Sequence, residues 1–449
     1  MRRFDAKGPV AAMLSAAQGA ARFHMPGHKG LLAPFDMTEL ASTDDLYAPA
    51  GGIGEAERLG AQACGAAHSL MLTGGATAGL MAMLLAYVPP GGKLLLPRNA
   101  HHAVLSACVW GDIRAVFADD AAEALARHPD VKAVLVTRPD YYGRCADLAP
   151  LVKTARRAGA LVLVDEAHGA HFPWWDAPQS AGRLGADAWV QSAHKTLPAL
   201  TGAAWLHLGQ SLDPRRARRF LRMAQTSSPP FPILASLDSS RAWMDAYGRR
   251  ALLDTIALTR DFRARLAGLS GYADATADDP TRLVLTTRGR GLSGLEAKAR
   301  LSRLSVDAEM ADDSRVVFIC TVADTRADFD RLFDALSAIP EDDPLPPASI
   351  PLPEPGPAVL PIRLAALSPQ EPVPLANAAG RVVSVSAGLY PPGAPAVLPG
   401  EMVTQAAVEW LANLPRERLF GVEDGALICV KRRALPCDTT RYSLTWTAR

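Results

Sequence analysis

A lysine and an aspartate, each at the end of a short and mostly apolar run, are the residues of this chain best placed to do chemistry. Lys195 follows the run 186–190, and Asp165 follows the run 161–164, thirty residues earlier. Such runs are typical of buried strands. Because ligands of an open parallel sheet bind outside the carboxyl ends of its strands, two neighbouring strands would bring both side chains to one place. A lysine that forms a Schiff base and an aspartate that pairs with a pyridinium nitrogen are the minimal equipment for pyridoxal phosphate (PLP).

The surroundings of these two residues strengthen that hypothesis, although a single lysine after a strand is usually an exposed loop residue. His168 follows Asp165 closely, and Ser192 and His194 flank Lys195. Upstream, the turn 74–77 precedes an expected helix, and a helix N-terminus that begins with small residues favours an anion such as a phosphate. The turn lacks the lysine of a nucleoside-triphosphate loop.

Strands and helices are expected to alternate through the first half of the chain, which is typical of a doubly wound α/β fold. The expected strands are 69–72, 93–97, 131–136, 161–165, 186–190 and one within 197–208, and the expected helices include 55–64, 77–87 and 148–158. The whole chain is divided into an N-terminal arm (1–20), a large domain (21–245), a small α+β domain (246–340), a Pro-rich linker (341–358) and a C-terminal domain (359–449).

Composition narrows the function classes. The chain has 449 residues and a formal net charge of +1, so no basic excess points to nucleic acid. Its six cysteines form no C-x-x-C pair, which is typical of reduced thiols in a cytoplasmic protein. We expect no secretory signal at the N-terminus and no metal site, because Pro26 and Gly27 separate His24 from His28 and break a helical pairing. The uncharged stretch 69–92 is interrupted by glycines, so we expect no membrane span.

Several motifs together resemble the ornithine/lysine/arginine decarboxylase family, in its short form without a receiver-like N-terminal domain. The motifs that carry the resemblance are Phe23-His24-Met25-Pro26-Gly27-His28-Lys29, Thr43-Asp44-Asp45-Leu46, Asp165-Glu166-Ala167-His168-Gly169-Ala170-His171, Ser192-Ala193-His194-Lys195-Thr196, Glu309-Met310-Ala311-Asp312, Tyr390-Pro391-Pro392-Gly393 and Leu398-Pro399-Gly400-Glu401. The resemblance runs over most of the chain and implies the aspartate-aminotransferase-like fold of PLP enzymes, with a mostly parallel central sheet.

The resemblance also implies a role for each site residue. Lys195 would form the Schiff base with PLP, and Asp165 would keep the pyridine nitrogen protonated. His101 would stack on the ring, with His168 nearby. The phosphate would be bound by Gly75, Ala76 and Thr77 together with Ser192 and His194. The family usually has a hydroxyl where Ala76 stands, so the phosphate contacts are expected to differ somewhat.

The implied reaction is decarboxylation of arginine, lysine or ornithine to its amine through a quinonoid intermediate, as in polyamine biosynthesis. A cationic substrate needs acids, and Asp44, Asp45, Glu309 and Asp312 are the candidates. The glycine-rich loop 50–54 departs from the commoner form of the family, which leaves its substrate contacts open. A homodimer or larger homo-oligomer with the active site at the interface is the expected assembly.

Three alternatives stay open at this point. An aminotransferase or another PLP lyase would use the same lysine and aspartate, and Arg282, Arg288 or Arg315 would then hold the substrate carboxylate. A helicase is indicated only by the letters D-E-A-H at 165–168, and the missing phosphate-loop lysine opposes it. A non-catalytic relative of the fold is opposed by the presence of both Lys195 and Asp165.

Overall fold

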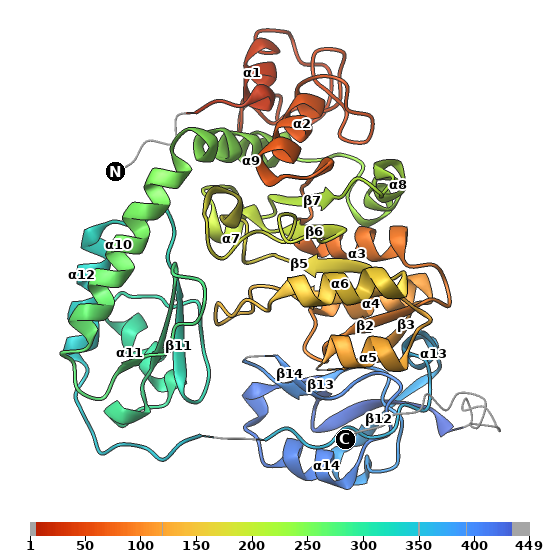
Figure 1. Ribbon diagram of the computed structural model, residues 1–449, viewed down its shortest axis with the longest axis vertical. Helices are drawn as coiled ribbons and strands as arrows, with labels where there is room; N and C mark the ends of the chain where they lie inside the picture. Colours follow the sequence, from red (N-terminus) through yellow and green to blue (C-terminus); the bar gives the residue numbers. More distant parts are fainter. Residues whose placement is uncertain (1–5, 119, 349–350, 392, 433–449) are drawn as a thin grey trace.

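The molecule is built on a seven-stranded, mostly parallel sheet with helices on both faces (Figure 1). The computed structural model describes residues 6–118, 120–348, 351–391 and 393–432. The strand order is β1-β7-β6-β5-β4-β2-β3, and β7 runs antiparallel to both of its neighbours. The strands are β1 (His68–Leu72), β2 (Lys93–Leu96), β3 (Arg114–Phe117), β4 (Val131–Thr137), β5 (Leu161–Asp165), β6 (Ala188–Gln191) and β7 (Ala204–Leu208).

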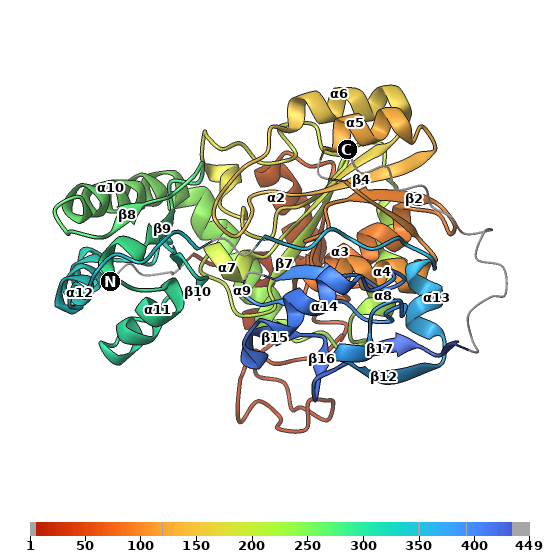
Figure 2. The ribbon, with the colours of Figure 1, turned by 90° about the horizontal axis from the view of Figure 1, so that it is seen from below.

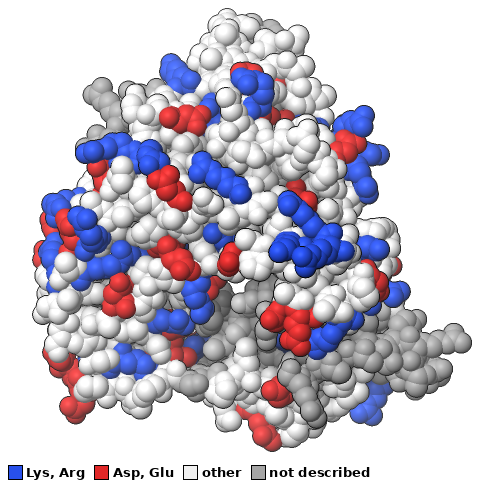
Figure 3. Space-filling model, viewed as in Figure 1, with Lys and Arg blue, Asp and Glu red and all other residues white. Residues whose placement is uncertain are grey.

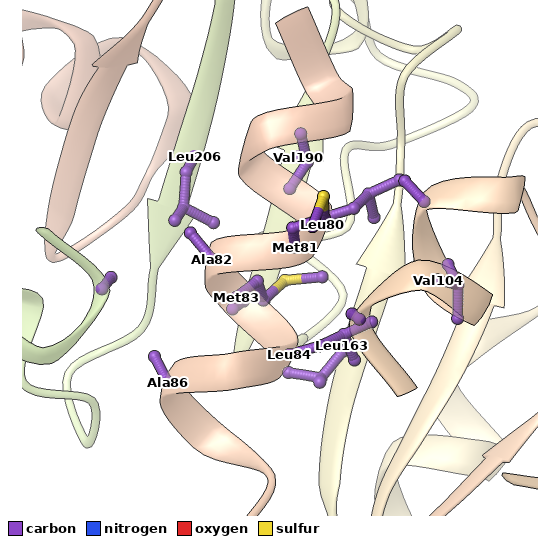
Figure 4. Close-up of a cluster of buried hydrophobic side chains, with 14 of the residues drawn as sticks. Leu80, Met81, Ala82, Met83, Leu84, Ala86, Val104, Leu163, Val190 and Leu206 are labelled. Carbon is purple, nitrogen blue, oxygen red and sulfur yellow. The ribbon is translucent and has the colours of Figure 1, made fainter. Parts of the chain in front are cut away.

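Successive residues of each strand contribute to two separate cores, because side chains alternate between the faces of a sheet. Leu163 and Val190 face a core that contains α3 (Gly75–Tyr87), α4 (His102–Gly111) and α8 (Pro214–Ala224). Val164 and Trp189 face the opposite core, which contains α5 (Ala121–Arg127) and α6 (Leu148–Ala158). Figure 4 shows side chains of α3, from Leu80 to Ala86, packed between Leu206 and Val104. Burial of α3 on all sides explains why its sequence is apolar throughout.

The N-terminal helices pack on one end of this sheet. Helix α1 (Pro9–Ala16) contacts α2 (Gly52–Cys64) and α9 (Phe231–Trp243) of the same chain, and its Val10 N–H donates to Asp238 Oδ2 at 2.9 Å. A π-helical turn, Met244–Gly248, then joins α9 to α10 (Arg249–Leu266). Figure 1 shows α10 leading away from the large sheet to a smaller unit.

The small unit, which runs from α10 to α12, contains a four-stranded antiparallel sheet ordered β10-β11-β9-β8 and covered by helices. Its core gathers apolar residues of α10, α11, α12 and the strands. Its elements are β8 (Ala273–Asp274), β9 (Arg282–Thr286), α11 (Gly294–Arg303), β10 (Met310–Ala311), β11 (Arg315–Ile319) and α12 (Arg326–Ala338).

The remaining described residues form a third unit with two three-stranded sheets. It packs against the large unit where α13 contacts α4 and where Glu401 pairs with Arg98. Figure 2 shows α13 and α14 on the same side of the large sheet as α3 and α4. Its elements are α13 (Ile362–Leu367), β12 (Gln370–Pro374), β13 (Ala387–Leu389), β14 (Ala394–Val397), α14 (Gln405–Ala412), β15 (Leu419–Phe420), β16 (Val422–Glu423) and β17 (Ala426–Val430).

The expected fold class is confirmed, and most expected elements are present. The helix over 148–158 and the strand over 161–165 have the expected bounds. The strand expected within 197–208 begins only at Ala204, because Gly202 turns the chain with φ of +95°. The numerical domain boundaries stay predictions, and residues 1–5 of the expected arm and 433–449 of the expected C-terminal domain lie outside the described residues.

Three observations bear on the expectations from composition. Over the described part of the chain, no helix is both long and apolar enough to cross a membrane. The cysteines of that part, Cys64, Cys108, Cys145, Cys320 and Cys429, are free thiols, and Cys437 lies outside it. Basic and acidic side chains are intermixed over the face shown in Figure 3, in keeping with the net charge near zero.

Candidate active site

The carboxyl ends of two neighbouring parallel strands place Asp165 and Lys195 together, as expected. Asp165 is the last residue of β5 and lies opposite Val190 of β6, and Lys195 lies in the short helix α7 (Ala193–Thr196) that follows β6. Asp165 is only 5% exposed, and the Ala167 N–H donates to its Oδ1 at 3.1 Å. Burial raises the pKa of Asp165, while the Ala167 N–H and the Lys195 charge oppose that rise. A buried carboxylate of this kind is stabilised by a cationic partner.

His168 links Lys195 to the small unit. The Lys195 Nζ lies 3.1 Å from His168 Nε2, and Arg282 Nη2 of β9 lies 3.4 Å from His168 Nδ1. The ring of Tyr141 packs on His168 with 4.7 Å between the ring centroids. Burial lowers the pKa of His168 well below its usual value, and the charges of Lys195 and Arg282 add to the effect. Burial likewise lowers the pKa of Lys195. Both groups are therefore biased toward their neutral forms.

His101 lies at the start of α4, after the carboxyl end of β2. Its Nδ1 accepts a hydrogen bond of 3.2 Å from the Ala103 N–H, so the ring serves as the N-cap of the helix. Although the residue is exposed, the protein packed around it lowers its pKa to about 4, with contributions from His102 and Lys195. A neutral ring is suited to stacking on a flat cofactor.

The glycine turn before α3 has the geometry of an anion site. Gly75 has a φ of +68°, and a Cβ added there would meet no atom within 4 Å, so this helix start faces open space. The Gly75 N–H is already bonded to Gly202 O at 2.9 Å. The Ala76 and Thr77 N–H groups follow in the first turn of the helix, where N–H groups lack helical partners. An anion at this turn would therefore be bound by those two groups rather than by Gly75.

Gln225 holds this turn in place, and sequence reasoning missed it. Its Oε1 accepts hydrogen bonds from the Thr73 and Gly74 N–H groups, at 2.8 and 2.9 Å. The residue sits in the loop after α8, far from the turn in sequence, and a lone glutamine in a Ser/Pro-rich loop carries no signal of its own. Its effect is to fix the two backbone units that precede the candidate phosphate site.

Ser192 and His194 lie on either side of the α7 N-terminus, next to Lys195. Ser192 is 1% exposed, and its N–H donates to Ala167 O, which ties α7 to the loop after β5. His194 Nδ1 lies 3.1 Å from Ala203 O, an acceptor only, so Nδ1 carries the proton there. Its Nε2 is then the acceptor of the neutral ring, and the ring donates to a phosphate from this atom only when it is protonated.

The two aspartates 44 and 45 are bound to their own loop. Asp44 is 9% exposed, and its carboxylate accepts N–H groups from Asp45, Ala50, Gly51, Ile53 and Gly54 at 2.8–3.2 Å. These bonds cap α2, whose N-cap residue is a glycine. Asp45 accepts a bond from the Tyr47 N–H at 2.8 Å. The geometry of Asp44 is that of a structural cap, and among the described residues neither acid has a hydrogen bond to Lys195.

Glu309 and Asp312 belong to the small unit, and their carboxylates differ in exposure and in hydrogen-bond partners. Asp312 is buried and accepts Tyr142 Oη at 2.7 Å and two N–H groups of the Arg315 guanidinium at 2.7 and 3.0 Å. Glu309 is exposed, and the Tyr141 hydroxyl donates to its Oε1 at 3.2 Å. Tyr141 in turn packs on His168, which contacts Lys195, and the negative charge of Glu309 opposes the lowering of the Lys195 pKa. Glu309 is the most exposed of the four acids, whereas Asp45 is half-buried and Asp44 and Asp312 are buried.

Glu166 is another residue whose role the sequence did not reveal. It is fully buried and accepts hydrogen bonds of 2.7–2.8 Å from the Ser180 hydroxyl, the Ala181 N–H and the Gln191 side chain. Burial raises its pKa to about 7 despite these bonds. Because Gln191 ends β6 and Glu166 follows β5, the network fixes the spacing of the two strand ends that present Lys195 and Asp165.

This arrangement defines a PLP-dependent enzyme of the aspartate-aminotransferase-like fold. The residues fit the cofactor, because a buried acid, a lysine biased toward its neutral form and an open helix N-terminus suit a pyridinium, an aldehyde and a phosphate respectively. Among solved structures, SPT with PLP has a similar fold, with a TM-score of 0.52 and 18% identity over 63% of this chain and 75% of that one.

The comparisons then place the chain more narrowly. The Orn/Lys/Arg decarboxylase major-domain model matches residues 30–273, and the C-terminal-domain model of the same family matches 363–418. The arginine decarboxylase of Bacillus subtilis is 31% identical, over 93% of this chain and 95% of that protein. The lysine decarboxylase LdcF of Francisella novicida shares the fold, with a TM-score of 0.79 and 17% identity over 95% of this chain and 81% of that one. The chain belongs to the Orn/Lys/Arg decarboxylase family.

Proposed function

We propose that this enzyme decarboxylates a basic amino acid, namely arginine, lysine or ornithine, to the corresponding amine, with PLP held by Lys195. The single observation that carries the proposal is the convergence of Lys195, Asp165 and His168 at adjoining strand ends, with the exposed Glu309 nearby. Relatives named arginine decarboxylase and lysine decarboxylase support the class of substrate.

Besides Lys195, four positions of this chain would hold the cofactor. The Ala76 and Thr77 N–H groups would bind the phosphate, the neutral His101 ring would stack on the pyridine, and Asp165 would keep a proton on the ring nitrogen. When bound, PLP supplies an electron sink for the bond that breaks at the substrate Cα. Since burial disfavours a lone negative charge on Asp165, a pyridinium beside it stabilises the carboxylate, and the carboxylate stabilises the pyridinium in turn.

Lys195 needs a neutral amine in order to act as a nucleophile. Burial lowers its pKa, so a larger share of the amine is unprotonated at neutral pH than in an exposed lysine. His168 Nε2, 3.1 Å from Nζ, is positioned to exchange a proton with that amine as it is bound and released. Burial also keeps His168 neutral, which leaves one ring nitrogen to donate and one to accept.

Glu309 is the acid best placed to recognise the distal cation of the substrate. It is exposed, it lies near Lys195, and it is oriented by the Tyr141 hydroxyl, whose ring packs on His168. Asp44 and Asp312 have their carboxylates occupied by backbone N–H groups and by Arg315, so binding a substrate there would first break those bonds. We therefore rank Glu309 above the other three acids.

A homodimer is part of the proposal. The loop 21–36 exposes large apolar side chains, with Phe23 94%, Leu31 90% and Leu32 84% exposed. Large apolar side chains exposed together on one loop are a feature of interaction surfaces, and a second copy of the chain is the partner that we propose for them. A cytoplasmic location and a place in polyamine synthesis stay predictions.

Transamination is the main rival, and it requires an arginine to retain the substrate carboxylate. Of the three candidates, Arg315 is paired with Asp312, and Arg288 donates to the carbonyl oxygen of Asp313. Arg282 lies near Lys195, but it is 1% exposed and bonded to His168. In the described structure Arg282 keeps two N–H groups without a partner, but its burial separates them from a substrate, which favours decarboxylation.

A product assay tests the proposal. The purified chain, supplied with PLP, is incubated separately with arginine, lysine and ornithine, and carbon dioxide and amine are both quantified. Carbon dioxide in equal amount to agmatine, cadaverine or putrescine would establish both reaction and substrate. A keto acid formed in the presence of an added acceptor, without carbon dioxide, would instead establish an aminotransferase. The Lys195→Ala variant is the matched control and should form neither product.

A further inference from the structure

Arg282 is a buried arginine that reaches from the small unit into the surroundings of Lys195. It begins β9, and its side chain is 1% exposed. Arginine is rarely buried to this extent without a paired partner, because removing its charge from water is costly. Residue 282 lies outside both segments that the family models match, so the family assignment gives it no role.

We propose that Arg282 is a positioning residue that donates to His168 Nδ1 and thereby holds His168 in the neutral tautomer whose Nε2–H faces the Lys195 amine. This inference rests on the proposed role of Lys195 in holding PLP. It adds a function for a residue that neither the sequence motifs nor the comparisons assign.

The first argument is the chemistry of the donors. A guanidinium only donates hydrogen bonds, so the Nη2 of Arg282, 3.4 Å from His168 Nδ1, requires that nitrogen to be an acceptor. In a neutral imidazole the proton then lies on Nε2. The Lys195 Nζ is 3.1 Å from Nε2, and it can accept this proton's hydrogen bond only as a neutral amine. The chain Arg282–His168–Lys195 thus favours the nucleophilic form of the lysine.

The second argument is that the charges around the chain Arg282–His168–Lys195, called the relay below, agree with this hydrogen-bond pattern. Besides burial, the pKa of His168 is lowered by Lys195, Arg282 and His101, and only Asp279 opposes. For Lys195, burial and Arg282 lower the pKa, while Asp165 and Glu309 raise it. Burial and the charge of Arg282 both disfavour a protonated His168, which leaves the neutral ring required by the hydrogen-bond geometry.

The third argument is a contrast with a second arginine of the same unit. Arg263 of α10 donates from Nη2 to the carbonyl oxygens of Pro280 and Arg282, at 3.2 and 2.8 Å, and thereby fixes the backbone of β9. In the described structure the Arg282 Nε and Nη1 atoms are buried without a hydrogen-bond partner, so its side chain contributes little to such bracing. The hydrogen bond that the described structure gives to the Arg282 side chain is that of Nη2 with His168 Nδ1, so this contact is the one that the buried guanidinium serves.

The test uses the PLP-loaded full chain. The absorbance band of the cofactor bound to the lysine is titrated with pH, and the midpoint of the change between its protonated and unprotonated forms is measured. Arg282→Met removes charge and donor, and we expect it to raise the midpoint by about one pH unit. Arg282→Gln removes the charge but keeps an N–H donor, and we expect less than half of that shift. In a His168→Gln background, Arg282→Met should likewise shift the midpoint by less than half as much, because the relay is already broken. Arg263→Gln, the matched control, should leave the midpoint unchanged.

Three outcomes would overturn the inference: equal shifts in Arg282→Met and Arg282→Gln, a full shift in the His168→Gln background, or the same shift in Arg263→Gln. Circular dichroism and the thermal midpoint verify that each variant is folded. If Arg282→Met does not fold, Arg282→Lys should keep the wild-type midpoint, and a shift as large as that of Arg282→Gln would contradict the relay. A wild-type chain without any such band would instead refute the proposed role of Lys195. Absence of carbon dioxide with the band and the coupling intact would refute only the proposed reaction.

Discussion

Asp44 offers a direct test of whether an acid in a family motif binds substrate or braces the fold. Its Oδ2 accepts the N–H groups of Gly51, Ile53 and Gly54, and its Oδ1 accepts those of Asp45 and Ala50. Ile53 and Gly54 belong to the first turn of α2, so this carboxylate replaces the side-chain cap that Gly51 lacks. The perturbation is Asp44→Ala, which removes all of these acceptors.

The expected cost follows from these contacts. An N-cap contributes about 1 kcal/mol, and a carboxylate near the positive end of a helix dipole adds ~0.3–1 kcal/mol. The two bonds in the turn before the helix add about 1 kcal/mol more. A loss of about 2–3 kcal/mol corresponds to a factor of ~30–150 in the local opening equilibrium. We expect α2 to lose protection by this factor while the KM for the preferred amino acid is unchanged.

Hydrogen–deuterium exchange followed by mass spectrometry measures this directly on peptides that cover 51–64. Peptides from α12, in the core of the small unit, serve as the internal control, because that core contains no residue of α2 among the described residues. The reasoning would be refuted if exchange in α2 stayed at the wild-type rate while the KM rose tenfold or more. That result would return Asp44 to the substrate site.

Three further predictions follow from the same contacts. Lys195→Ala should abolish the cofactor–lysine absorbance and turnover, measured by spectrophotometry and by the product assay. Glu309→Gln should raise the KM about 5- to 30-fold with little change in kcat, because a partly exposed charge pair contributes ~1–2 kcal/mol, whereas Asp45→Asn should leave the KM unchanged. Asp279 is buried, and although burial opposes its ionisation, His171 lowers its pKa to about 2. Its stabilising effect is therefore complete above pH ~4 and is lost as the pH falls toward 2, so Asp279→Asn should flatten acid unfolding over that window.

The helices and strands of the large sheet were predictable because their sequence signals are local. Helix α6 is bracketed by Asp147 at its N-cap and Gly159 in a left-handed conformation at its end, and both signals are visible in the sequence. The π-helical turn at 244–248 has no such signal, because it depends on how α9 and α10 pack against different units. The late start of β7 at Ala204 likewise depends on the turn at Gly202, which contacts Thr73 O of another segment.

The central site residues were predictable for the same reason, and their neighbours were not. Asp165 and Lys195 follow apolar runs, and the carboxyl ends of neighbouring parallel strands lie at the same edge of a sheet. The Asp44 and Asp312 carboxylates are indistinguishable in sequence from a free acid such as Glu309, because their backbone N–H and arginine partners appear only in the folded chain. Arg282 reaches His168 only through the pairing of β9 in a separate sheet, a long-range contact that no local pattern encodes.

The chemistry of Lys195 therefore depends on how the small unit packs against the large one. Two side chains of the large unit close to the lysine, His168 and Tyr141, each contact a residue of the small unit, namely Arg282 and Glu309. The same pair of units is held together by His171 and Asp279, 3.3 Å apart and both buried. Under the proposals above, the arginine biases the lysine toward its neutral form and the glutamate recognises the substrate, so separating the units would remove both effects at once. A variant that loosens this contact should lose nucleophilicity and substrate affinity together, although it touches neither the lysine nor the cofactor.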